Sequence, residues 1–501
     1  MTAETEEAHP SADVAAEPYS IYDKRQKGLV ILLVSTAATF SGFASNIYFP
    51  ALPTIAQDMK VSVELINLTV TSYLLLQGIA PSFWGPLSDV KGRRVTYCGT
   101  FLVFLGACIG LAESRNYATL VVLRSLQSSG SASTIAVGSA VIGDITTREE
   151  RAGFMGIFQA GLLAPVAVGP VIGGALAASL GWRAIFWFLA IYCGVFLVVL
   201  IFSLPETLRS SVGNGSVIPS SVITRYPLRL YQTRTTVKYH PQTPPAQAAK
   251  KGGIDITGPI RILFSKQAAP VVLCLAIYYA VWQMGITAMS ALFASRYNLN
   301  ETQIGLTFIA NGAGSIIGTL VTGKIQDMDY LRVKSNHEIQ RVQSATGGTV
   351  IPSATDYDPV DFPLEKARLR LLPLLALLQC GAVVAFGWTI QSHVHISVPI
   401  IFTFVTGWTA ISIVSMVTTY LIDIFPDQKA AASASLNLAR CLLAAASTSV
   451  VTLVIGALGV GWTFTIAAAV QLVALLGVGI QLRYGKKWRI EAEQARKQAQ
   501  E

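Results

Sequence analysis

The stretch Gly85-Pro86-Leu87-Ser88-Asp89-Val90-Lys91-Gly92-Arg93-Arg94 lies between two long apolar runs. It is a short basic loop with one acid, and its glycines permit a tight turn. Both flanking runs are long enough to cross a bilayer, because a spanning helix needs about 20 mainly apolar residues. The stretch therefore predicts two membrane helices joined by a charged turn, and it sets the frame for the rest of the chain.

The composition also indicates lipid as the solvent. Of the 501 residues, 52% are hydrophobic and 13% are charged, whereas soluble domains carry about 25% charged residues. Roughly twelve apolar segments have spanning length, and they lack the alternation of barrel strands. These segments lie near residues 28–49, 66–86, 95–113, 119–143, 154–176, 184–204, 268–292, 303–325, 371–390, 398–424, 431–457 and 462–482.

The basic residues are concentrated in alternate loops. The formal net charge is +9, and the basic clusters lie at 24–27, 91–94, 148–151, 209–266, 332–370 and 483–489. The intervening loops carry only Lys60, Arg115, Arg183 and Arg296. By the positive-inside rule both termini are cytoplasmic, and an even number of spans agrees. The charge thus indicates orientation in the membrane, and we expect no nucleic-acid partner.

The remaining composition signals predict neither a disulfide nor a cofactor site. All six cysteines lie in apolar segments without a CxxC pattern, which favours packed thiols over a disulfide or metal site. Residues 1–20 are polar and acidic and are not a cleaved signal peptide. The sequon at Asn300 is a glycosylation candidate in a predicted external loop that is short and close to the membrane.

Residues 209–266 interrupt the apolar pattern with proline, serine and basic residues, and we predict a cytoplasmic linker there. It divides the spans six and six. The predicted domains are a tail at 1–27, a six-helix bundle at 28–208, the linker at 209–266, a second six-helix bundle at 267–482 with a cytoplasmic loop at 328–369, and a tail at 483–501.

The two halves show weak internal similarity. The matching pairs are Gly85-x3-Asp89 with Gly323-x3-Asp327, Asp144 with Asp423, and Gly181-Trp182 with Gly461-Trp462. A parallel repeat predicts two six-helix bundles around a central cavity, which rock to give alternating access.

The quoted stretch resembles motif A of the major facilitator superfamily. The resemblance implies a cytoplasmic gate in which Asp89 accepts hydrogen bonds from helix N-termini and from Arg148 or Arg151, and Arg93 and Arg94 pair with Asp144. The alternative is a basic turn that only sets topology. The gate residues implied are Gly85, for close helix approach, with Asp89, Gly92, Arg93, Arg94, Asp144 and Arg151.

Two further motifs extend the resemblance. Leu123-Arg124-x-x-Gln127-x-x-Gly130 resembles motif B, with Ser128 at a position that is usually glycine. An arginine inside a span is costly, so Arg124 should face a cavity or a partner; the alternative is snorkelling to the outer interface. Residues 164–174 resemble motif C, which marks antiporting exporters. Its hinge and packing residues are Pro165, Gly169, Pro170, Gly173 and Gly174.

Short motifs typical of a subfamily occur at residues 205–209, 419–426 and 434–441. Together they look like the fungal twelve-span drug:proton antiporter group, which contains quinidine-resistance-type pumps and citrate exporters. The resemblance covers nearly all of residues 28–489. It implies a monomeric, multi-pass transporter, and we expect the plasma membrane, although vacuolar relatives share these motifs.

The charged residues inside the predicted spans indicate the class of substrate. Arg440 lies about ten residues into its span and shares a face with Asn437, whereas the acids in the spans fall at predicted cytoplasmic ends. Paired guanidinium groups without a nearby carboxylate suit a carboxylate substrate. The predicted binding residues are Arg124, Gln127, Asn437, Arg440, Gln159 and Gln77.

The sequence therefore predicts export of a small organic anion such as citrate by alternating access. The alternative is a broad drug:proton antiporter, with protons as the coupled ion, although no proton carrier stands out. The chain has no GxxxxGK[ST] phosphate loop and no convincing catalytic cluster, so we expect neither an ATP-driven pump nor an enzyme.

Overall fold

The computed structural model describes residues 19–217, 257–345, 362–425 and 428–498. These residues form helices and connecting turns and contain no strand. The N-terminal half contains α1 (Lys24–Asn46), η1 (Phe49–Ala51), α2 (Leu52–Met59), α3 (Val63–Lys91), α4 (Arg93–Ala112), α5 (Tyr117–Ile145), α6 (Arg148–Leu180), α7 (Arg183–Ser203) and α8 (Arg209–Val212). The C-terminal half contains α10 (Gly258–Leu263), α11 (Ala269–Tyr297), α12 (Glu301–Ile317), η2 (Gly318–Thr322), α13 (Gly323–Ala345), α14 (Leu364–Leu369), α15 (Leu372–Gln391), α16 (Ser397–Ile424), α17 (Lys429–Leu458) and α18 (Val460–Gln498).

Helix α5 corresponds to the predicted fourth span and has an unusually polar sequence for a membrane helix. In the described part of the chain, 11 helical stretches are long and apolar enough to cross a membrane. The predicted fourth span is absent from that set, although α5 has 29 residues. Its sequence contains Arg124, Gln127 and a run rich in serine, and α5 packs against α1, α3 and α4. The neighbouring helices therefore bury its polar side chains and keep them away from lipid.

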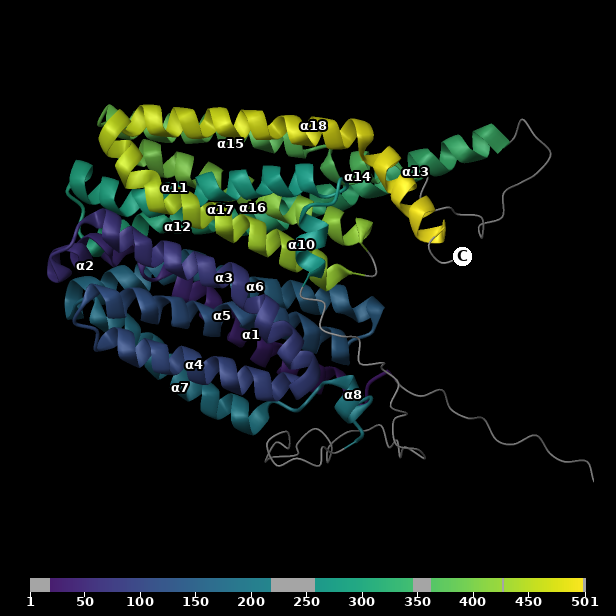
Figure 1. Ribbon diagram of the computed structural model, residues 1–501, viewed down its shortest axis with the longest axis horizontal. Helices are drawn as coiled ribbons and strands as arrows, with labels where there is room; N and C mark the ends of the chain where they lie inside the picture. Colours follow the sequence, from purple (N-terminus) through teal and green to yellow (C-terminus); the bar gives the residue numbers. More distant parts are fainter. Residues whose placement is uncertain (1–18, 218–256, 346–361, 426–427, 499–501) are drawn as a thin grey trace, which may run out of the picture.

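Figure 1 shows the two halves of the chain lying side by side, the first in purple to teal and the second in teal through green to yellow. In the first half α1 packs on α5 and α6, and α4 packs on α5 and α7. In the second half α11 packs on α17 and α18, and α15 packs on α16 and α18. Two helix pairs make the most extensive contacts between the halves, α6 with α12 and α3 with α17, and α2 and η1 add smaller contacts with α11 and α12. We call these pairs the two seams.

Polar side chains join the halves at the end of the molecule away from the chain termini. The joining pairs are Thr54 with the Glu301 carboxylate, Asn67 with Thr452 at 2.7 Å, and Thr71 with Thr448 at 3.2 Å. Nearer the middle of the seam, Asn437 Nδ2 donates to the carbonyl of Gln77 at 3.0 Å. The two halves are therefore in contact at the end of both seams that lies away from the chain termini.

Two helices continue beyond the predicted spans. Helix α13 continues to Ala345, so the segment predicted as a loop at 328–369 begins as helix, and α18 runs through the predicted tail to Gln498. A span predicted from hydropathy stops where the sequence becomes polar, whereas backbone hydrogen bonds continue through polar residues with good helix propensity. Residues 346–361 of that loop, 1–18 of the first tail and 218–256 of the linker lie outside the described residues.

The cysteines and the sequon are placed by the same helices. All six cysteines are free; Cys98 is partly exposed and the other five are buried, as expected for packing thiols. Asn300 is the exposed N-cap of α12, and its side-chain oxygen accepts from the Gln303 backbone N–H at 2.9 Å.

Candidate functional site

Glu206 organises the turn within residues 85–94, where α3 ends and α4 begins. Its carboxylate accepts hydrogen bonds from the backbone N–H groups of Arg93 at 2.9 Å and Arg94 at 3.3 Å, at the start of α4. It also accepts from Thr207 and Leu208, each at 3.0 Å. A buried carboxylate at a helix N-terminus satisfies amides that have no partner within the helix. Glu206 thus fixes the turn between α3 and α4.

Gly92 is the glycine that this turn requires. Its φ is +104°, and a Cβ there would collide with the Glu206 carboxylate. We expected Gly85 to provide a close helix approach, but a Cβ at Gly85 would meet nothing within 4 Å. That expectation was wrong, because the tight contact of this motif is made where α4 begins.

Arg93 is the centre of the charged cluster. Its guanidinium donates to Asp144 at 3.0 Å, to Asp89 at 2.5 Å and to the Ser88 hydroxyl at 2.6 Å. The Asp144 side chain is 15% exposed and that of Asp89 is 63% exposed. The ion pair of Arg93 with Asp144 was expected and is largely buried, whereas Asp89 lies at the protein surface.

Two expected partners of this cluster lie elsewhere. Arg94 donates to the carbonyl oxygens of Leu204 and Ile201, at 2.6 and 2.7 Å, whereas the ion pair of Asp144 is with Arg93. Arg151 donates to the carbonyl oxygens of Gly143 and Thr146, at 3.0 and 3.2 Å. Both guanidinium groups therefore bind the ends of neighbouring helices, where carbonyl groups lack partners within the helix.

The residues of motif C form the contact surfaces of α6. A Cβ at Gly173 would collide with the Ile47 carbonyl after α1, and a Cβ at Gly174 would collide with the Glu301 carbonyl at the start of α12. Pro165 lies against Gly42 of α1, and the Pro170 carbonyl faces Gly305 of α12. Small residues thus let α6 approach α1 on one side and the second half of the chain on the other.

Gly169 differs from the other glycines of this motif. A Cβ there would lie 3.5 Å from the nearest atoms, the Ile47 backbone nitrogen and a ring carbon of Phe43. That separation is an ordinary van der Waals contact. Gly169 therefore has room for a methyl group, although the sequence presents it as equivalent to Gly174.

This difference predicts the outcome of a matched pair of substitutions. We expect Gly174→Ala to disfavour the closed contact between α6 and α12 by about 1–3 kcal/mol, because the new methyl group overlaps the α12 backbone. Gly169→Ala should change the free energy of closing that contact by less than about 0.5 kcal/mol. The measurement is thiol labelling of a cysteine introduced at Thr452, with transport measured in parallel. Equal labelling in both variants would contradict the assigned role of Gly174.

Arg124 is enclosed within the N-terminal half. Its side chain is 1% exposed, and the guanidinium carbon lies 4.3 Å from the ring centre of Tyr48 and 4.5 Å from that of Tyr73. It donates to the Ala44 carbonyl at 3.2 Å and to Gln127 Oε1 at 2.5 Å. These groups replace water around the buried cation through cation–π contacts and charge-assisted hydrogen bonds. The structure therefore gives Arg124 partners within its own bundle and does not show it snorkelling.

Arg440 lies at the seam between the halves. Its Nε and Nη2 donate to Asn437 Oδ1 at 3.2 and 2.9 Å, and its guanidinium carbon lies 5.0 Å from the Tyr279 ring centre. Asn437 in turn donates to the carbonyl of Gln77 across the seam. These partners are neutral, and the Arg440 side chain remains partly exposed. Arg440 can therefore present donors to an anion between the halves.

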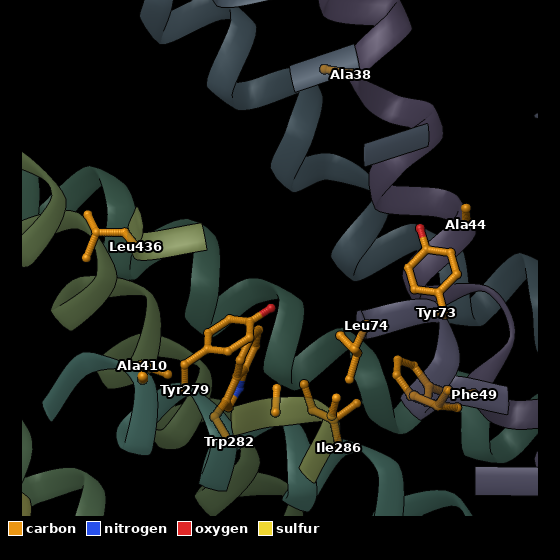
Figure 2. Close-up of a cluster of buried hydrophobic side chains, with 14 of the residues drawn as sticks. Ala38, Ala44, Phe49, Tyr73, Leu74, Tyr279, Trp282, Ile286, Ala410 and Leu436 are labelled. Atoms are coloured by element: carbon orange, nitrogen blue, oxygen red, sulfur yellow. The ribbon is translucent and has the colours of Figure 1, made fainter. Parts of the chain in front are cut away.

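The two arginine sites approach each other through aromatic rings. The ring of Tyr73 lies over Arg124, and the ring of Tyr279 lies over Arg440. Figure 2 shows Tyr73, Tyr279 and Trp282 in one cluster of buried side chains. The Trp282 indole N–H donates to Asn311 Oδ1 at 3.3 Å. The cluster gives the seam a wall that is aromatic and cationic.

The predicted glutamines are divided between different environments. Gln127 has partners within the first half at both ends of its amide: the oxygen accepts from Arg124, and the nitrogen donates to Cys108 Sγ at 3.2 Å. Gln77 lies on the seam with its side-chain oxygen buried and without a hydrogen-bond partner among the described residues. Gln159 is exposed on α6, and among the described residues it makes no hydrogen bond to Arg124 or Arg440. Only Gln77 therefore lies beside Asn437 and Arg440.

Sequence reasoning missed the aromatic residues of this site and the role of Glu206. Tyr48, Tyr73 and Tyr279 lie in apolar segments, where a tyrosine is indistinguishable from core packing. Glu206 occurs in the subfamily motif at residues 205–209, which signalled its importance but not its contact with α4.

Comparisons with known proteins agree with this architecture. A family profile described as Major Facilitator Superfamily matches residues 34–339. Citrate exporter 1 of Aspergillus niger is 36% identical over 94% of this chain and 88% of its own length. The multidrug transporter QDR2 of Candida glabrata is 33% identical over 95% of this chain and 83% of its own length.

The solved structure of the xylose transporter XylE from E. coli, in a partially occluded inward open conformation, resembles the fold with a TM-score of 0.61 and 15% identity. It covers 92% of this chain and 98% of its own. The expected fold class and the resemblance are confirmed, and the protein is a transporter and not an enzyme. The chain belongs to the major facilitator superfamily and is a multi-pass membrane protein that acts as a secondary transporter of small molecules.

Proposed function

We propose that this protein exports a small organic anion, of the di- or tricarboxylate type, through the seam between its two halves. The observation that carries the proposal is the placement of Arg440. Its guanidinium is partly exposed at the seam, and its contacts include only neutral side chains, those of Asn437, Tyr279 and Cys441, among the described residues. A carboxylate would accept two parallel hydrogen bonds from this group and neutralise its charge.

The distribution of acidic residues supports an anion over a cation. In the spans, aspartates and glutamates occur near the helix ends, as at Glu64, Asp89, Asp144, Glu301 and Asp423. A cationic drug entering the middle of the seam would meet Arg440 without a carboxylate to offset the repulsion. The citrate exporter among the relatives is consistent with the same substrate class.

The second candidate is a broad drug:proton antiporter. The aromatic wall made by Tyr73, Tyr279 and Trp282 favours it, because flat apolar molecules stack on such rings. The multidrug transporter among the relatives also supports this alternative. Under either proposal protons are the coupled ion.

The proposed setting is the plasma membrane, with both termini in the cytoplasm and one chain as the functional unit. The basic clusters in the loops on the termini side support this orientation. The outer seam, where Thr54 meets Glu301, then faces outward, and the structure corresponds to a state closed on the outside.

Transport in proteoliposomes separates the two candidates. Vesicles containing the purified protein are loaded with labelled citrate or with a cationic dye, and efflux is compared with that of protein-free vesicles, with and without a pH gradient. We expect protein-dependent efflux of citrate and none of the dye. Efflux of the dye without citrate would replace the anion proposal with the drug antiporter.

A further inference from the structure

A groove of about 510 Å³ lies at the termini end of the second half, away from the seams. It is formed by α10 with the turn that follows it, the end of α16 and the last turns of α18, near the marked C-terminus in Figure 1. Its polar and charged lining residues are Arg261, Ser265, Lys266, Gln267, Gln428 and Glu491, with Ile262, Phe425, Trp488 and Ala492 as the apolar part.

The walls of this groove are fixed to each other. Gln267 Nε2 donates to the Trp488 carbonyl of α18 at 3.0 Å, and Gln481 Nε2 donates to the Gln267 carbonyl at 3.0 Å. Ile262 is 2% exposed and anchors α10 in the core. The groove is therefore a preformed hollow between elements that are hydrogen-bonded together.

The groove presents two available cations. Arg261 and Lys266 are exposed, and within the described ranges neither side chain has a hydrogen bond or an ion pair. The one acid in the lining, Glu491, lies 3.9 Å from Lys487 of the same helix. Since Lys487 offsets Glu491, the charges of Arg261 and Lys266 remain for a ligand.

Apolar side chains flank these cations on the surface. Phe264 is 78% exposed and Ile260 is 49% exposed, and both belong to the same short segment as Arg261. Tyr484 and Trp488 stack at 6.1 Å on the neighbouring helix. Cations beside exposed apolar and aromatic side chains at the end of membrane helices are typical of the lipid headgroup region. A soluble anion would use the cations but leave Phe264 and Ile260 in water.

We propose that this groove is a binding site for an anionic phospholipid, with the phosphate held by Arg261 and Lys266 and the acyl chains lying along Ile260 and Phe264. The proposal is independent of the transported substrate. It gives α10, which lies near the end of the predicted linker, a fixed contact with the membrane surface on the side where anionic lipids are enriched in the proposed orientation.

The test is lipid binding to the purified full chain in detergent, measured by native mass spectrometry with phosphatidylserine and with phosphatidylcholine. We expect the double variant Arg261→Ala/Lys266→Ala to bind phosphatidylserine about 10- to 30-fold more weakly than the wild type, from two lost surface cations. Binding of phosphatidylcholine should change less than about twofold. The matched control is Arg332→Ala/Lys334→Ala, which removes two exposed cations from α13 and should retain wild-type binding.

A second variant separates a lipid from a soluble anion. Phe264→Ser should weaken phosphatidylserine binding and leave the cations in place. Glycerophosphoserine, which has the headgroup without acyl chains, should compete poorly. Wild-type binding by the double variant, an equal loss in the α13 control, or competition by glycerophosphoserine at the same concentration as the lipid would each overturn the proposal.

Discussion

Replacing Arg440 with alanine is expected to reduce export of a carboxylate substrate by about 10- to 100-fold. Hydrogen bonds to a charged group contribute about 1.5–3 kcal/mol, and Arg440 offers such donors at the seam. The loss should be seen in the initial rate of labelled citrate efflux from proteoliposomes. Because Arg440 is partly exposed and its partners are neutral, its removal leaves no buried charge unpaired, and the protein should fold.

Two further variants make this expectation specific. Arg440→Lys retains the charge but loses the planar fork, so its efflux should lie between those of the wild type and the alanine variant. Arg332→Ala removes an exposed cation of α13 and should leave efflux unchanged. Full citrate efflux by a well-folded Arg440→Ala protein would contradict the proposed carboxylate contact.

Replacing Glu206 with alanine is expected to destabilise the protein by about 3 kcal/mol. The substitution leaves the backbone N–H groups of Arg93, Arg94, Thr207 and Leu208 without the carboxylate that accepts from them. Losing buried acceptors of this kind costs about 1–3 kcal/mol for each group left unsatisfied, less where water enters. The measurement is the apparent Tm of the purified protein, and we expect a fall of about 5 °C or more.

Two further variants test whether this loss of stability comes from the capping of α4. Glu206→Gln keeps one acceptor oxygen and should lower the Tm by less than alanine does. Glu113→Ala removes an exposed acid at the opposite end of α4 and should leave the Tm within about 1 °C. A similar fall in all three variants would show that the Glu206 contacts do not stabilise the turn.

Arg93 and Gly92 show how far local sequence predicted the gate. A charged loop with a glycine at its end predicts a turn and an ion pair, and both are present, with Gly92 at φ +104° and Arg93 on Asp144. The same reasoning assigned close packing to Gly85 and an ion pair to Arg94. It failed there because the approach of α7 and its following turn brings Glu206 and the Leu204 carbonyl to α4, and no local pattern encodes that approach.

The sequence by itself determined the order of the long apolar helices and the small residues of motif C, and it predicted the division into two halves. These follow from run length, from the internal repeat and from residue size, which are local properties of the chain. Only the tertiary structure decided which arginine is enclosed and which is available. Arg124 and Arg440 each lie inside a span, but the rings of Tyr48 and Tyr73 enclose the first, whereas the second lies at the seam beside Gln77. That outcome depends on how α3 and α11 rotate and pack against their neighbours, because burial is a property of the assembled helices and not of any single one.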